Sequence, residues 1–169
     1  MNEIALNPLG WLAVAEALQA DTVALRRAIH AEPELGLETP KTMAKVRAAL
    51  AGLPLEWKQG RSTTGAIAVL RGGKPGRIVL LRGDMDALPM PEDTGLPVRS
   101  KVQGAMHAGG HDSHTAMLVS AARALCARRD AFAGTVLFMF QPGEEGWHGA
   151  KKMIEDGLLA TAPEPFDTL

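Results

Sequence analysis

The stretch Gly134–Gln141, GTVLFMFQ, decides the fold of this chain. It carries no charge and is rich in β-branched and aromatic side chains, which makes it the strongest strand pattern in the chain. The continuous apolar run Ile78–Leu81 (IVLL) predicts a strand buried on both faces, within Arg77–Arg82. Buried strands of this kind are typical of sheets inside α/β domains.

Helical patterns precede these strands. Apolar residues at helical spacing predict a first helix over residues 12–30. Thr39 and Pro40 predict a second helix over 41–50, with Thr39 as its cap. Further expected elements are strands over 55–58 and 66–70, a helix after the histidines that Asp112 or Ser113 caps, a helix over 146–156, and an unstructured tail over 161–169.

The alternation of helices and strands predicts an α/β class, with three layers in which helices cover both faces of one sheet. A length of 169 residues fits one domain. Chemistry in such sheets gathers in loops beyond the carboxyl ends of the strands. Three groups of polar residues occupy loops of this kind, and each is a candidate for a site.

The first group lies in Met106–Thr115, MHAGGHDSHT, which holds three of the five histidines. Imidazole is the commonest metal ligand, so this histidine cluster predicts a metal site with His111 as its leading ligand. The alternative is that His111 is an exposed loop residue before a capped helix. His107 and His114 are interpreted either as outer partners that orient ligands or as ordinary polar residues. Asp112 is a further outer candidate.

The second group is Glu144 and Glu145, a carboxylate pair between Gly143 and Gly146. Adjacent side chains in an extended segment point apart. One carboxylate could therefore bind a metal while the other takes a proton from water, which is the division of labour that hydrolysis needs. The alternative is that both glutamates merely favour the first turn of a helix.

The third group is Asp84 and Asp86, directly after the predicted strand that contains Ile78–Leu81. Their carboxylates are interpreted either as ligands or as acceptors for histidine. Aspartate also suits the turn after a strand, which is the structural alternative.

Composition narrows the class of protein. The net charge of −1 argues against a nucleic-acid partner or an anionic membrane surface. No apolar run approaches ~18 residues, so no membrane span is expected. The single cysteine, Cys126, excludes an internal disulfide and fits reducing surroundings. A cytoplasmic protein is therefore expected.

Four segments together resemble the N-acyl-amino-acid amidohydrolases, a family that includes hippurate hydrolase and the plant auxin-conjugate hydrolases. The resemblance covers nearly the whole chain after about residue 25. The segments are LRRAIHAEPELGLET (25–39), LLRGDMDALPMPEDTGLP (80–97), MHAGGHDSHTAML (106–118) and GTVLFMFQPGEEGWHGAKKMIEDGLL (134–159).

The resemblance implies a metallo-exopeptidase-like fold and a metal-dependent amidohydrolase that releases an amino acid from an N-acyl conjugate. It implies that His111 and Glu145 are metal ligands and that Glu144 is the general base. Glu144 would take a proton from water that attacks the amide carbonyl, and would return it to the leaving amine. The implied cofactor is one or two divalent ions, Mn²⁺ or Zn²⁺, with Co²⁺ or Ni²⁺ as further possibilities.

The chain departs from the family pattern at Gly109, where relatives usually carry cysteine. The lost thiolate should lower metal affinity and suit harder ions such as Mn²⁺, and a single ion could occupy the site. Family members are also more than twice as long. The resemblance therefore implies that residues 1–169 form part of a catalytic domain, without further histidine ligands and without an inserted lid domain that commonly mediates dimerisation.

Two hypotheses follow from Gly109 and from the difference in length. The chain represents a metal-dependent amidohydrolase whose longer form is a homo-oligomer, or it is a truncated, non-catalytic product that binds metal weakly or associates with other chains. From the missing histidines we expect that the 169 residues alone do not cleave N-benzoylglycine. We also expect Val136–Phe140 to expose apolar surface, because this segment should face partners that the chain lacks.

Overall fold

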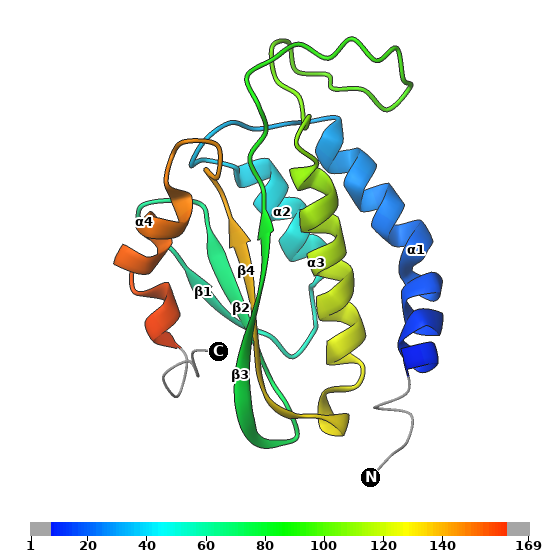
Figure 1. The fold of residues 1–169 in the computed structure, drawn as a ribbon, viewed down its shortest axis with the longest axis vertical. Coiled ribbons are helices and arrows are strands. Elements are labelled where there is room, and N and C mark those ends of the chain that lie inside the picture. Colours follow the sequence, from blue (N-terminus) through cyan, green and yellow to red (C-terminus); the bar gives the residue numbers. More distant parts are fainter. Residues whose placement is uncertain (1–7, 162–169) are drawn as a thin grey trace.

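A four-stranded mixed sheet forms the centre of the molecule, with the strand order β1-β2-β4-β3 (Figure 1). The structure is a computed structural model that describes residues 8–161, so the predicted tail lies almost wholly outside the described residues. Strand β4 is parallel to β3 and antiparallel to β2, which is antiparallel to β1. The strands are β1 (Glu56–Gln59), β2 (Ala66–Arg71), β3 (Lys74–Asp84) and β4 (Ala133–Gln141).

Helices cover both faces of this sheet, which confirms the predicted three-layer α/β class. Helices α2 and α3 pack on one face with α1 against α3, and α4 and η3 lie on the other (Figure 1). Among the described residues, no helix combines the length and the apolar character needed to cross a membrane. The helices are α1 (Pro8–His30), α2 (Pro40–Ala49), α3 (His111–Cys126), α4 (Gly149–Glu155) and the short 3-10 helices η2 (Arg129–Ala131) and η3 (Leu158–Thr161).

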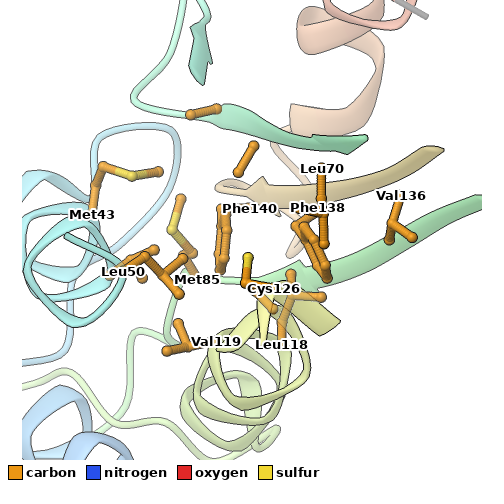
Figure 2. Packing of buried hydrophobic residues seen from close by; sticks show 14 residues of the cluster. Met43, Leu50, Leu70, Met85, Leu118, Val119, Cys126, Val136, Phe138 and Phe140 are labelled. Atoms are coloured by element: carbon orange, nitrogen blue, oxygen red, sulfur yellow. The ribbon is translucent and has the colours of Figure 1, made fainter. Parts of the chain in front are cut away.

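Two apolar clusters fill the space between the layers. Figure 2 shows the larger one, in which Phe138 and Phe140 of β4 lie against Leu118 and Cys126 of α3. The smaller cluster, on the opposite face, includes Met153 of α4. Neighbouring residues along β2 and β4 fall alternately into the two clusters because successive side chains of a strand point to opposite faces.

The burial of the strands differs from two expectations. The run Ile78–Leu81 is not buried on both faces: β3 is the edge strand of the described sheet, and Val79 is 50 % exposed. Conversely, Val136–Phe140 exposes almost no apolar surface, because β4 is central and lies between β2 and β3. The prediction that this segment faces missing partners is therefore wrong.

The starts of three helices also differ from expectation. Thr39 precedes α2 as predicted, but its side chain makes no capping bond; the carboxylate of Glu34 instead accepts the N–H groups of Lys41 and Thr42. Helix α3 begins at His111 rather than after Asp112 or Ser113, so neither residue is its cap. Helix α4 begins at Gly149 rather than at residue 146, because Gly146 and His148 adopt positive φ angles that interrupt a helix.

Candidate metal centre

The candidate residues meet where β3 and β4 end and α3 begins. Figure 1 shows the carboxyl ends of the two parallel strands at the same end of the molecule as the first turn of α3. Asp84 is the last residue of β3, Glu144 and Glu145 follow β4 closely, and His111 opens α3. This is the edge of the sheet at which the sequence predicts chemistry.

His111 is buried, with only 7 % of its surface exposed, so the exposed-loop alternative does not hold. Its Nδ1 lies 2.8 Å from the backbone carbonyl oxygen of Asp86. A carbonyl can only accept, so Nδ1 carries the hydrogen and Nε2 of the neutral ring keeps its lone pair. The fold therefore presents Nε2 as a ligand atom.

The two glutamate carboxylates converge on that nitrogen. Oε2 of Glu144 and Oε1 of Glu145 each lie 3.9 Å from Nε2 of His111. The expectation that the neighbouring side chains point apart is not met, because the segment turns here: the N–H of Gly146 donates to the carbonyl of Glu144 over 2.8 Å. His111, Glu144 and Glu145 thus form a compact group of three potential ligands.

Asp86 holds this group in place from beneath. Its buried carboxylate accepts the backbone N–H of Glu144 through Oδ1 at 2.9 Å and that of Glu145 through Oδ2 at 3.1 Å. Burial opposes the ionisation of Asp86, but its interaction with His111 and these backbone bonds together lower its pKa below the usual value. Asp86 therefore lies outside the cluster of ligand atoms and orients it.

Asp84 and His114 form a second group with His111. Nδ1 of His114 donates to Oδ1 of Asp84 over 2.6 Å, and Oδ2 of Asp84 lies 3.7 Å from Nε2 of His111. The three side chains also satisfy the spacing of a metal-binding group. Asp84 is 4 % exposed, whereas His114 is exposed at the surface.

The carboxylates around His111 raise the pKa of its ring. The Asp86 side chain, opposed by burial and assisted by the charge of Asp84, raises the pKa of His111 to about 9. A cation at Nε2 must therefore displace a proton at neutral pH.

The other two predicted outer residues, His107 and Asp112, are buried and belong to neither group of potential ligands. Both ring nitrogens of His107 are buried without a hydrogen-bond partner, and burial lowers its pKa to about 4, so the ring is neutral at pH 7. Asp112 is fully buried, and its Oδ2 accepts Nδ1 of His30 at 2.7 Å and Nε of Arg26 at 2.8 Å. Asp112 thus joins α3 to α1.

His30 is the site-adjacent residue that the sequence did not single out. Its Nε2 lies 3.1 Å from the carboxylate of Glu92, so the ring bridges α1, α3 and the long loop between β3 and α3. From the residues alone, His30 is an ordinary histidine at a helix end. Its only signal is its place in the segment 25–39 that carries the family resemblance.

The donor set fits a divalent cation. It offers one imidazole nitrogen and several carboxylate oxygens, which suit Mn²⁺ and Zn²⁺. Gly109 borders the same space: a Cβ atom built on it would lie 3.4 Å from Oε1 of Glu145 and 3.7 Å from Nε2 of His111. A side chain at position 109 would thus contact the potential ligand atoms of Glu145 and His111, and glycine leaves this space open.

Comparisons with known proteins agree with this geometry. The chain is 42 % identical over 151 residues to the hippurate hydrolase of Campylobacter jejuni, with 89 % of this chain and 38 % of that protein aligned. It is 41 % identical over 145 residues to the N-acetylcysteine deacetylase of Bacillus subtilis, with 85 % of this chain and 38 % of that protein aligned. The crystal structure of a dinuclear metal-binding peptidase from Bacillus subtilis superposes on this chain with a TM-score of 0.81 at 40 % sequence identity. The superposition covers 87 % of this chain and 42 % of that protein.

The chain therefore spans about two fifths of the length of these proteins. Residues 80–168, which include Asp84, the histidine cluster and the glutamate pair, match the peptidase family M20/M25/M40. The strand ends, the His111 ligand atom and the paired carboxylates all fall within the matched region. The chain belongs to the peptidase family M20/M25/M40.

Proposed function

We propose that this chain carries the metal and base residues of an amidohydrolase that cleaves N-acyl amino acids into a carboxylic acid and an amino acid. The observation that carries the proposal is the approach of two carboxylates, Glu144 and Glu145, to within 3.9 Å of Nε2 of His111, the ring nitrogen that the Asp86 carbonyl leaves free for a ligand bond. His111 and Glu145 are the proposed ligands, and Glu144 is the proposed base.

A bound divalent cation supplies Lewis acidity that polarises the scissile carbonyl and lowers the pKa of water. Glu144 is the more exposed of the two glutamates, so its carboxylate can reach a water molecule and accept its proton. The water oxygen forms a bond to the carbonyl carbon, the carbon–nitrogen bond breaks, and Glu144 returns the proton to the leaving nitrogen. Asp86 holds the backbone of both glutamates and the ring of His111 in these positions.

The substrate class is inferred from the relatives. Hippurate and N-acetylcysteine, named for two of them, are both amino acids with an acylated amino group. The proposed cofactor is one or two ions of Mn²⁺ or Zn²⁺, with Co²⁺ or Ni²⁺ as alternatives.

The decisive experiment measures release of glycine from N-benzoylglycine by the native gene product, purified from its own host and loaded with Mn²⁺ or Zn²⁺. We expect Glu144→Gln to lower kcat/KM by roughly 10²-fold or more while the bound metal is retained. Asp93→Asn removes one carboxylate from an exposed loop residue and serves as the control. Turnover that survives Glu144→Gln would overturn the role of the base.

The second candidate function is a metal-binding product without catalysis. Gly109 favours it, because glycine contributes no ligand beside Glu145 and His111. Native protein that binds Mn²⁺ through these residues but hydrolyses none of a panel of N-acyl amino acids would establish this alternative.

A further inference from the structure

The acyl group is the part of the substrate that the proposed function leaves open. The relatives on which the proposal draws are named for a benzoyl conjugate, hippurate, and for an acetyl conjugate, N-acetylcysteine. They match this chain at 42 % and 41 % identity, so similarity does not choose between an aromatic and a small acyl group. A side chain beside the glutamates that contacts the acyl group would make this choice.

An aromatic side chain, Trp147, lies two residues beyond Glu145 along the chain. Two residues of extended chain span at most about 7 Å, so the Cα atom of Trp147 lies within this distance of the Cα atom of Glu145. Trp147 is 55 % exposed. A large aromatic ring that is open to solvent beside a candidate site is a potential contact for an apolar ligand.

The indole of Trp147 lies against the segment between α1 and α2. A Cβ atom built on Gly36 would lie 3.2 Å from Cε2 of the ring and 3.4 Å from Nε1. The same segment borders the site, because the carbonyl of Glu34 accepts the N–H of Ala87, the residue after Asp86, over 2.8 Å. Figure 1 shows this segment at the end of the molecule where β3 and β4 end. The ring therefore lies between Gly36 and the loop that carries the glutamates.

The backbone on both sides of Trp147 is held in a tight turn. The N–H of Gly149 donates to the carbonyl of Gly143 over 2.9 Å and closes this turn. His148 has a φ of 55°, and within residues 8–161 it is the one residue other than glycine with a positive φ. Such a conformation persists only where the surroundings impose it, and it is typical of functional sites. A ring held in this way is ordered before a ligand arrives, which lowers the entropic cost of binding.

We infer that the exposed part of the Trp147 ring forms one wall of the subsite for the acyl group and makes this protein prefer aromatic acyl groups. A benzoyl ring can pack against the indole and gains from this contact beyond the area that it buries. An acetyl group has no ring and gains little. The inference rests on the proposed function, because the subsite is placed by its distance from the glutamates.

The first test compares kcat/KM for glycine release from N-benzoylglycine and from N-acetylglycine by the native gene product, purified from its own host and loaded with Zn²⁺. We expect the wild type to prefer the benzoyl substrate. Trp147→Leu should lower the ratio of the two values roughly tenfold, through the benzoyl substrate. Trp147→Phe, which keeps an aromatic ring, should retain most of the preference.

The matched control is Trp11→Leu. Trp11 lies near the start of α1, at the opposite end of the molecule from the site (Figure 1), so this variant should leave the ratio unchanged. If the wild type favours N-acetylglycine, or if Trp147→Leu keeps the benzoyl preference, the subsite is wrong while the hydrolysis stands. A variant that loses stability at an unchanged ratio would assign the ring to a contact with another part of the protein.

A binding measurement separates the subsite from turnover. In Glu144→Gln protein, we expect N-benzoylglycine to change the tryptophan fluorescence. The change should disappear when Trp147→Leu is added and persist when Trp11→Leu is added. Binding that calorimetry detects without a change that depends on Trp147 would overturn the inference. If the wild type cleaves neither substrate but this change is present, the hydrolysis fails and the subsite stands; if N-benzoylglycine is neither cleaved nor bound, both fail.

Discussion

At the scale of single residues, Asp86 organises the candidate site although it donates no ligand atom. Its carboxylate fixes the backbone of Glu144 and Glu145, and its carbonyl fixes the ring of His111. Both oxygen atoms of the carboxylate are needed because two N–H groups point at it. An amide in the same place could accept only one of these bonds.

Asp86→Asn should therefore leave one backbone N–H facing an amide donor. We expect the free energy of unfolding to fall by about 1–3 kcal/mol, the usual cost of an unsatisfied buried group. The pKa of His111 should also fall from about 9, because the Asp86 side chain is the main cause of its rise. Urea unfolding and NMR titration of the His111 ring measure the two effects. A pKa that stays near 9 would assign the shift to another group.

His111 also makes metal affinity dependent on pH. Below its pKa of about 9, the ring must lose one proton before Nε2 can bind a cation. Between pH 8 and pH 6.5 we expect the apparent affinity for Mn²⁺ to fall about tenfold for each pH unit. Calorimetry in two buffers of different ionisation enthalpy should show about one proton released per ion. Affinity that is constant over this range would contradict the assignment.

At the scale of elements, the start of α4 sets the course of the loop that carries the glutamates. Gly149 opens α4 directly against the segment that follows β4, and its N–H donates to the carbonyl of Gly143. A Cβ atom at position 149 would fall 1.7 Å from the carbonyl oxygen of Pro142. Because that oxygen belongs to the backbone, no rotation of a side chain could relieve the clash.

Gly149→Ala should therefore displace the loop and lower the stability of the chain by about 1–3 kcal/mol, as overpacking usually does. Gly157→Ala is the matched control. Its Cβ atom would meet no atom within 4 Å, so the variant loses stability only because alanine disfavours the φ of 79° at this position. We expect Mn²⁺ affinity to drop in the first variant and to stay unchanged in the second. Thermal melts and calorimetry of both proteins make the comparison. Equal metal affinity in the two would show that the loop tolerates the shift.

At the scale of the whole molecule, buried ionisable groups join the layers beside the site. His30 on α1 bridges Asp112 on α3 and Glu92 in the loop between β3 and α3. His107, near the ring of His30, is buried and neutral, with a pKa lowered to about 4. The folded chain therefore resists protonation of His107, and its stability depends on pH.

The sign of this dependence follows from the two states. The unfolded chain binds a proton at His107 near pH 6.5, whereas the folded chain does so only near pH 4, so stability falls as the pH drops through this window. From pH 7 to pH 5 we expect His107 to account for a loss of about 2 kcal/mol. Urea unfolding at both values should show a smaller loss in His107→Leu. His148→Asn, which removes an exposed histidine, should behave as the wild type.

The sequence alone determined the α/β class, the strand at Gly134–Gln141 and the candidate site residues, because hydrophobic pattern, turn residues and ligand chemistry are local properties. It also contained the segments by which the family is recognised. The neighbours of a strand are not a local property. The exposed edge of β3 and the complete burial of Val136–Phe140 were therefore decided by the strand order.

Tertiary structure likewise decided what each polar residue does. Asp84 and Asp86 look alike in the sequence, yet one faces Nε2 of His111 and the other lies beneath the glutamates. Asp112 was expected near the ligands but pairs with His30, a residue 82 positions away along the chain. These roles depend on distances between segments that only the packing of the layers brings together, so no pattern along the chain could predict them.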